Sequence, residues 1–373
     1  MSASQDRYDA VIVGGGVAGA SLGAELASSM SVLLVEMEDQ PGYHSTGRSV
    51  AFWSETYGGP LVRPLTRLSR ALLDRPEPDF SERGFLSPRG AIHIGRAEDR
   101  GRRDAMLGEY RDDAALVPID GAQMRRHVPG LRPEWVVGLE EASTRDIDVA
   151  GFHAACLRSF RRRGGMLACS TRLDRARKVT DGWKVDLSTG PVQAGLIVDA
   201  AGAWADDVAI ACGVPPLGIT PLLRTVAQLR VDPPAPDAMP LVLDLAERFY
   251  FKPVGGGRIW LTPHDEQPVQ PADVAPDELD VAVAIDRFQS VVDWRVEAVE
   301  RKWAGLRSFA PDRLPVYGHD PDVADFFWFA GQGGFGIQTA PAAARLARSL
   351  ILGTDDPVIA GLDAALYAPG RLR

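Results

Sequence analysis

The chain has 373 residues, of which 45% are hydrophobic and 24% charged, and its formal net charge at pH 7 is −9. This composition is typical of a globular protein with a large core, and the negative charge argues against a nucleic-acid-binding protein, which would carry a basic face. The three cysteines, Cys156, Cys169 and Cys212, lack metal-ligand spacing, and no apolar run is long enough to cross a bilayer. We therefore predict a cytoplasmic protein with reduced thiols, no metal site and no transmembrane segment.

The N-terminal segment predicts a βαβ unit. An apolar run over residues 8–13 leads into glycines at positions 14, 16 and 19, a helical pattern over 17–30, and a second apolar run over 32–35 that ends in Glu36. This is the pattern of a dinucleotide-binding fold. Gly14 permits a tight turn, Gly16 lets the backbone approach a pyrophosphate, and Gly19 lets the helix pack closely on the strand. The helix N-terminus favours phosphate, and Glu36 can accept hydrogen bonds from a ribose diol.

The next hundred residues contain weaker signals. A polar loop over 41–49 precedes a predicted helix over 61–73 and a proline-rich connection over 74–82. Alternation over 90–95 and 135–140 predicts two strands, and the charged stretch between them, 97–128, predicts surface helices and a loop.

The second half alternates between two kinds of sheet. We predict a helix over 149–162, strands over 166–170, 183–187, 193–194 and 196–199, and a small-residue turn over 200–204. Antiparallel strands follow over 226–229, 249–252 and 258–261, then a helix over 278–293. Strands over 303–309 and 326–330 precede a glycine-rich segment, 331–338, that opens a final helix over 339–352.

This order predicts an α/β fold with two domains. Residues 1–82, 146–219 and 306–373 would form a Rossmann-like nucleotide-binding domain. Residues 83–145 and 220–305 would form an antiparallel-sheet cap domain that binds substrate. Ligand sites in such proteins lie at the domain junction.

Five segments carry a resemblance to a known family: the N-terminal fingerprint, the loop 43–49, the turn 199–204, and the paired segments 303–309 and 331–338. Together they resemble the D-amino-acid oxidase (DAO) superfamily of FAD-dependent oxidoreductases, and the closest match is to its D-arginine dehydrogenase branch. The resemblance implies a FAD-binding domain of the glutathione-reductase type and non-covalent FAD, although some relatives attach flavin through a histidine in the loop that contains His44. The helix opened by 331–338 could stabilise negative charge on a reduced flavin.

The resemblance also implies the cofactor-binding residues, which come from each matched segment. They are Gly14, Gly16, Val17, Ala18, Gly19, Glu36, His44, Ser45, Thr46, Gly47, Arg48, Ser49, Ala201, Gly202, Trp204, Gly305, Arg307, Gly334, Phe335, Gly336, Ile337 and Gln338.

For the substrate, the resemblance implies that Arg224 and Arg307 bind an amino acid carboxylate with help from the hydroxyls of Tyr57 and Tyr250. An arginine fork suits a carboxylate, and the charge of Arg307 in a mostly apolar strand would be costly without a partner. The remaining expected pocket residues are Phe52, Ser54, Ala91, Leu241, Leu243, Gly333 and Gln338.

Three positions depart from the D-arginine dehydrogenase pattern. Phe52 stands in place of a histidine, Ala91 in place of a glutamate that would pair with a cationic side chain, and Ser54 in place of a threonine. We therefore expect arginine and lysine to be poor substrates and the side-chain pocket to be apolar.

The resemblance implies oxidative deamination of a neutral or apolar D-amino acid by hydride transfer from Cα to flavin N5, giving an imine and then a 2-oxo acid and ammonia. One alternative is oxidation of a secondary, N-methyl or pathway-specific amino acid. Another, from a different class, is a non-catalytic flavin-binding protein. The electron acceptor would be dioxygen or a quinone.

Overall fold

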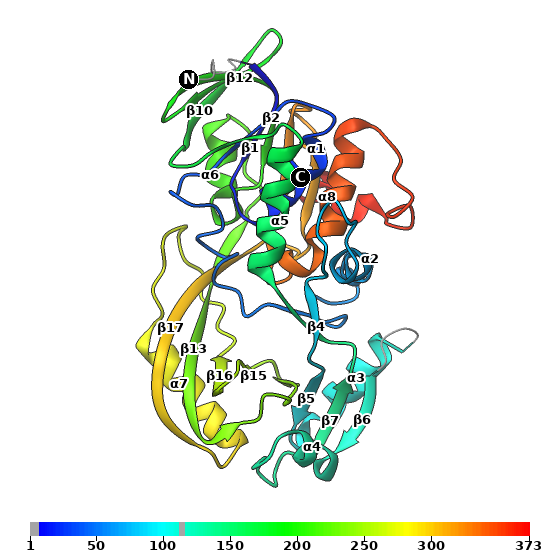
Figure 1. Ribbon diagram of the computed structural model, residues 1–373, viewed down its shortest axis with the longest axis vertical. Helices are drawn as coiled ribbons and strands as arrows, with labels where there is room; N and C mark the ends of the chain where they lie inside the picture. The colour runs from blue at the N-terminus through cyan, green and yellow to red at the C-terminus, as the bar shows by residue number, and fades with distance from the viewer. Residues whose placement is uncertain (1–6, 112–115) are drawn as a thin grey trace.

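A computed structural model of the protein describes residues 7–111 and 116–373. Two large sheets, one of eight strands and one of nine, lie toward opposite ends of its long axis (Figure 1). A third, small sheet consists of β3 (Phe52–Trp53), β4 (Leu86–Pro88) and β8 (Arg145–Ile147). The chain passes between the two large sheets several times, so residues from distant segments meet where the sheets approach each other.

The eight-stranded sheet contains the predicted βαβ unit. Strand β1 (Arg7–Val13) pairs in parallel with β2 (Val32–Val35) on one side and with β12 (Gly190–Asp199) on the other. The remaining strands are β9 (Met166–Ala168), β10 (Leu173–Val179), β11 (Gly182–Leu187), β18 (Val316–His319) and β19 (Phe326–Ala330). The parallel order brings the C-terminal ends of β1, β2 and β12 together, where nucleotide ligands bind in such folds.

Four helices pack around one another on this sheet: α1 (Val17–Leu26), α2 (Arg63–Asp74), α5 (Val149–Arg162) and α8 (Gly336–Leu352). Their small and aromatic residues form a common core with the apolar side chains of β1 and β19. Helix α1 ends four residues before the predicted end, because Ser28 and Ser29 are weak helix formers and the chain turns back after Leu26. Helix α8 begins at Gly336 rather than at residue 339 and carries Pro341 near its start.

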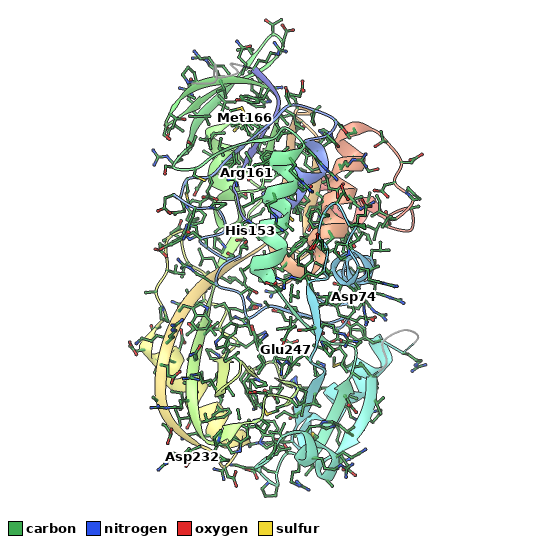
Figure 2. The ribbon with its side chains drawn as sticks, viewed as in Figure 1. Asp74, His153, Arg161, Met166, Asp232 and Glu247 are labelled. Carbon is green, nitrogen blue, oxygen red and sulfur yellow. The ribbon has the colours of Figure 1, made fainter. Side chains whose placement is uncertain are left out.

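The nine-stranded sheet is built around two long strands, β13 (Thr220–Ala235) and β17 (Arg295–Phe309), which run side by side along the molecule (Figure 1). Asp232 near the end of β13 lies at the extremity farthest from the eight-stranded sheet (Figure 2). The other strands are β5 (Ala91–Gly95), β6 (Leu116–Asp120), β7 (Val137–Glu141), β14 (Leu241–Asp244), β15 (Tyr250–Pro253), β16 (Gly257–Thr262) and β20 (Gln332–Gly333).

The prediction of a purely antiparallel cap sheet is wrong at one place. Strand β14 pairs in parallel with β5, so the sheet is mixed. The parallel pair arises because β5 and β14 come from segments nearly 150 residues apart, and no short turn dictates their relative direction. Helix α7 (Glu278–Val291) packs on this sheet through Val281, Ala284 and Phe288.

The stretch predicted as surface helices and a loop is more varied. It contains a 3₁₀ turn over Ala97–Asp99, helix α3 (Arg100–Glu109), strand β6 and helix α4 (Gly121–His127). Strand β6 was not predicted, because Pro118 interrupts the alternation of apolar and polar residues. Proline is tolerated there because β6 is an edge strand of the nine-stranded sheet. The division into two domains at the predicted boundaries stays a proposal, and β17 extends four residues past the boundary placed after residue 305.

Cys156 and Cys212 are buried, whereas Cys169 is half-buried, and all three are free thiols. Helix α6 (Ala205–Ala211) contributes to a second core with β10 and β12.

Within residues 7–111 and 116–373, no helix has both the length and the hydropathy needed to cross a membrane.

Candidate functional site

A cavity of about 320 Å³ is lined by residues from both large sheets and from the loop that joins β2 to β3. Its wall includes the C-terminal ends of β1, β2 and β12, the beginning of α1, and parts of β13, β15 and β17. It therefore extends from the fingerprint glycines to the substrate residues expected from the sequence.

The turn after β1 has little room for side chains. Gly14 has a φ of +106°, and a Cβ there would lie 2.5 Å from the carbonyl oxygen of Ala200. A Cβ on Gly19 would lie 1.9 Å from the carbonyl oxygen of Gly14. Both glycines therefore allow close backbone packing between β1, α1 and β12, as the fingerprint predicts.

The buried carboxylate of Glu36 holds this turn in place. Its Oε2 accepts a hydrogen bond of 2.8 Å from the backbone N–H of Gly15, and its Oε1 accepts one of 3.0 Å from that of Glu38. From α5, His153 Nε2 lies 2.9 Å from the carbonyl oxygen of Gly15 (Figure 2). Burial lowers the pKa of His153, which favours a neutral ring that donates from Nε2. No motif in the sequence predicted this role of His153.

The loop over residues 42–51 connects the two sheets. Thr46 Oγ1 accepts a hydrogen bond of 2.9 Å from the N–H of Val17, the first residue of α1. Ser45 Oγ donates one of 2.6 Å to the carbonyl oxygen of Leu306, and Arg48 Nη1 donates one of 3.1 Å to that of Ala304. His44 Nε2 lies 2.7 Å from Glu38 Oε1, and its ring lies 4.7 Å from that of Trp204. These bonds fix the loop along the cavity wall.

These residues fit an FAD molecule. Gly16 and Val17 at the start of α1 line the cavity, where the positive end of the helix dipole would favour a pyrophosphate, and Glu36 in the same wall would suit a ribose diol. Gly202, Gly305 and Gly334 line it too, and at Gly202 a Cβ would point into open space. The other predicted cofactor residues in the wall are Gly14, Ala18, His44, Ser45, Thr46, Arg48, Ser49, Ala201, Trp204, Arg307, Gly336, Ile337 and Gln338.

At the substrate end, Arg307 Nη1 donates a hydrogen bond of 3.1 Å to the hydroxyl of Tyr57. Arg224, Tyr250 and Phe52 complete this part of the wall, and Gly333 lies beside it. The Phe52 ring contacts Tyr57 and Tyr250, with centroids 4.9 and 5.7 Å apart. Arg224 Nη1 and Arg307 Nε are buried and have no hydrogen-bond partner in the part of the chain that the structure describes. A buried donor without a partner is costly, so an acceptor placed beside these atoms would be favoured.

Gly334 explains how the arginine and the tyrosine come so close to the backbone. A Cβ at this position would lie 2.5 Å from the Tyr57 hydroxyl and 2.9 Å from Arg307 Nη1. Gln338 of α8 supports the same segment, because its Nε2 donates to the carbonyl oxygen of Tyr57 and its Oε1 accepts from the N–H of Ser54. Gly334, just before α8, and Gln338, within it, therefore position Tyr57.

Sequence reasoning missed a carboxylate beside the two arginines. Glu266 Oε1 lies 2.6 Å from Arg307 Nη2, 3.5 Å from Arg224 Nη2 and 2.9 Å from Arg313 Nη2. The preceding residue, Asp265, accepts hydrogen bonds from the N–H of Thr225 and lies 3.7 Å from Arg224 Nε. Acidic residues in an irregular loop, such as this one, have no distinctive pattern in the sequence.

Some predicted residues lie outside the cavity wall. Ala91 and Leu241 are buried in a cluster with Phe52 and Tyr250, with Leu243 packed against it, so they support the wall from behind. Ser54 is buried, and it donates hydrogen bonds from its N–H to Gln338 and from its hydroxyl to Glu141. Among the expected cofactor residues, Gly19, Gly47 and Phe335 shape the backbone or the core near the cavity. Their direct ligand roles stay predictions.

Burial controls the protonation of the polar groups at this end. It raises the pKa values of Tyr57 and Tyr250, although the positive charge of Arg224 acts in the opposite direction. Burial, followed by the charge of Arg224, lowers the pKa of His264 to about 4. The two tyrosines therefore keep their protons and can donate, while His264 is neutral at physiological pH.

Comparison with known proteins identifies the family. Residues 9–350 match the family model described as "FAD dependent oxidoreductase" (DAO). The FAD-dependent oxidoreductase domain-containing protein 1 of Bos taurus is 26% identical over 93% of this chain and 82% of its own length. Glycine oxidase of Geobacillus kaustophilus is 24% identical over 92% and 93% of the two chains. Mitochondrial dimethylglycine dehydrogenase of Rattus norvegicus is 24% identical over 95% of this chain and 44% of its own length.

Two solved structures share the fold. Glycine oxidase from Geobacillus kaustophilus superposes with a TM-score of 0.85 at 22% identity, and L-proline dehydrogenase from P. horikoshii with a TM-score of 0.85 at 20% identity. Each comparison covers 98% of both chains. None of the proteins named here is a D-arginine dehydrogenase, so the match to that branch stays an expectation.

Proposed function

Because the chain belongs to the DAO family of FAD-dependent oxidoreductases, we propose that it oxidises the carbon–nitrogen bond of a small amino acid with a neutral side chain. The observation that carries this proposal is the group formed by Arg224, Arg307, Tyr57 and Tyr250 in the wall of one cavity with the FAD-binding residues. Two guanidinium groups and two protonated phenols are suited to hold one carboxylate.

In this proposal the protein orients the substrate. Arg307 and Arg224 bind the carboxylate, and Tyr57, whose hydroxyl oxygen already accepts a bond from Arg307, directs its own proton to the ligand. Holding the carboxylate in this way also fixes the carbon that is to be oxidised. Bound FAD supplies the two-electron acceptor for the hydride that leaves this carbon.

No strong base needs to lie at the substrate end. Of the described residues in the cavity wall, Glu36, His44 and Asp207 carry a carboxylate or an imidazole. Glu36 holds the turn after β1, and His44 pairs with Glu38. The chain therefore favours a substrate whose amine is already neutral when the hydride leaves, and its residues contribute position and electrostatics.

Two classes of amine fit this site. The first is a neutral D-amino acid, as the sequence resemblance implies. The second is a secondary or N-methyl amino acid, and two of the similar proteins favour it, a dimethylglycine dehydrogenase and an L-proline dehydrogenase. Phe52 also favours it, since an aromatic ring packed between Tyr57 and Tyr250 offers an apolar surface to an alkylated nitrogen.

Cationic side chains fit less well. Ala91 lies in the buried cluster behind the wall, where a glutamate would be needed to pair with a guanidinium. A buried cation without a partner is costly. We therefore expect D-arginine and D-lysine to be poor substrates.

The test is to mix the FAD-loaded protein with candidate substrates in the absence of oxygen. The loss of visible flavin absorbance then reports reduction of the cofactor. A panel of glycine, N-methylglycine, N,N-dimethylglycine, L-proline, D-alanine and D-arginine separates the amine classes. Bleaching by at least one of the first five and not by D-arginine is expected. Absence of bleaching by any small amino acid would favour the non-catalytic flavoprotein instead. Reoxidation by air or by an added quinone then identifies the electron acceptor.

A further inference from the structure

Glu266 contacts the group that would bind the substrate carboxylate. Its Oε1 is shared by Arg307, Arg224 and Arg313, so one carboxylate of the protein occupies part of the hydrogen-bonding capacity that a ligand carboxylate needs. The distances rank the contacts: Arg307 at 2.6 Å and Arg313 at 2.9 Å are close, and Arg224 at 3.5 Å is weak.

The three arginines differ in exposure. The side chains of Arg224 and Arg307 are 6% and 12% exposed, whereas that of Arg313 is 52% exposed. Losing Glu266 therefore costs most at the buried Arg307, where an unpaired charge is poorly solvated, whereas Arg224 keeps Asp265 at 3.7 Å from its Nε. Arg313 lies nearer to solvent and can keep Glu266 when the buried pair takes another anion.

The backbone around Glu266 is held on both sides. Asp265 binds the N–H of Thr225, the carbonyl oxygen of Gln267 accepts from the N–H of Leu223, and the N–H of Val269 donates to Pro221. Farther along the loop, Asp273 binds Arg48 and Tyr43. The Glu266 side chain is one-third exposed, so it can rotate away from the buried arginines while the loop stays in place.

We propose that Glu266 is a competitor of the substrate carboxylate and thereby selects for amines that carry one. A ligand carboxylate replaces Glu266 on Arg307 and Arg224, and Glu266 remains on Arg313. An amine without a carboxylate cannot displace Glu266, because it would leave the buried guanidinium of Arg307 without the anion that pairs with it. This inference rests on the proposed function, since it needs the two arginines to bind the substrate carboxylate.

The opposite role makes the opposite prediction. If Glu266 instead positioned the two arginines for the ligand, its removal would weaken carboxylate binding. If it competes, its removal exposes Arg307 and Arg224 to the ligand and strengthens binding. The sign of the change therefore decides between the two roles.

The experiment titrates the FAD-loaded protein with propionate, which has a carboxylate and no nitrogen to be oxidised, and follows the flavin spectrum or the heat of binding. Glu266→Gln is expected to lower the Kd of propionate about tenfold, and Glu266→Ala is expected to do the same. Glu300→Gln is the matched control, because Glu300 also pairs with an arginine, Arg258, whereas Glu266 pairs with Arg307 and Arg224. Its Kd should equal that of the unaltered protein.

Two further arms complete the test. Arg313→Gln should raise the Kd of propionate in the unaltered protein and change it less than twofold in the Glu266→Gln background, since Arg313 acts by receiving Glu266. Propylamine should not bind to the unaltered protein. An unchanged or raised Kd for propionate in Glu266→Gln would overturn the inference. If propionate binds to none of these proteins, the carboxylate site itself is wrong, and the proposed function fails with it.

Discussion

The Nη1 atom of Arg307 on β17 lies 3.1 Å from the hydroxyl oxygen of Tyr57, a residue 250 positions away in the chain. The hydroxyl accepts this bond and donates none among the described residues, so its proton is available to a ligand. A carboxylate placed between the two groups would receive hydrogen bonds from both.

This pair leads to the first prediction. Arg307→Ala should raise the KM and the Kd of a competing carboxylate by about 10- to 100-fold, since a hydrogen bond to a charged group contributes about 1.5–3 kcal/mol. Tyr57→Phe should raise them by about 3- to 10-fold, since a neutral bond contributes about 1 kcal/mol. The absorbance of bound flavin serves as the control and should be retained. Variants that bind the carboxylate as tightly as the parent protein would refute the assignment.

The second prediction concerns the cofactor. Glu36→Ala removes the acceptor for the N–H of Gly15 and of Glu38 in the buried turn after β1. Leaving a buried donor without a partner costs about 1–3 kcal/mol, so the Kd of FAD should rise by about 5- to 100-fold. Flavin fluorescence during reconstitution of the apoprotein measures this Kd. Glu134→Ala, an exposed glutamate outside the cavity wall, should have no effect. Equal FAD affinity for all three proteins would contradict the role of Glu36.

The third prediction compares two helical glycines. A Cβ on Gly19 in α1 would lie 1.9 Å from the carbonyl oxygen of Gly14, whereas a Cβ on Gly101 in α3 would meet nothing within 4 Å. Gly19→Ala should therefore destabilise the protein by about 1–3 kcal/mol and weaken FAD binding. Gly101→Ala should stabilise it by about 0.5–1 kcal/mol through helix propensity. Thermal unfolding followed by circular dichroism measures both. If both substitutions changed the free energy of unfolding in the same direction, the close contact between Gly19 and the carbonyl oxygen of Gly14 would not determine the effect.

The fourth prediction concerns pH. His264 Nδ1 lies 2.6 Å from the carbonyl oxygen of Glu247, which lies between the two large sheets (Figure 2), and His264 has a φ of +59°. Its pKa is lowered to about 4 by burial and then by Arg224. Between about pH 6.5 and pH 4, the unfolded chain binds a proton that the folded protein does not. Stability therefore falls as pH falls through this window, by up to about 1.4 kcal/mol per pH unit.

His264→Asn is the suitable variant. Asparagine keeps a donor for the Glu247 carbonyl, tolerates a positive φ and does not titrate in this range. Urea unfolding at pH 7, 6 and 5 should show a smaller loss of stability for the variant than for the parent protein. Identical slopes against pH would indicate that His264 titrates normally.

The sequence alone was sufficient for the βαβ unit and the FAD family, and it predicted two arginines for the substrate. The glycines at 14, 16 and 19 and the acid at 36 are close in sequence, and the shape of a tight turn restricts which residues it accepts. The resemblance that links residues 43–49 to the C-terminal glycines identified Arg224, Arg307, Tyr57 and Tyr250, and the structure places all four around one cavity.

The tertiary structure was needed for the contacts that join distant segments. The parallel pairing of β14 with β5 arises from packing between segments that no local turn connects. Ala91 and Leu241 lie behind the cavity wall, because their place depends on which neighbours cover them. Glu266 meets Arg307 only after the loop before α7 is bound to the start of β13. A carboxylate in a loop has no periodic pattern, so its partners depend on the folded chain, and local sequence does not encode them.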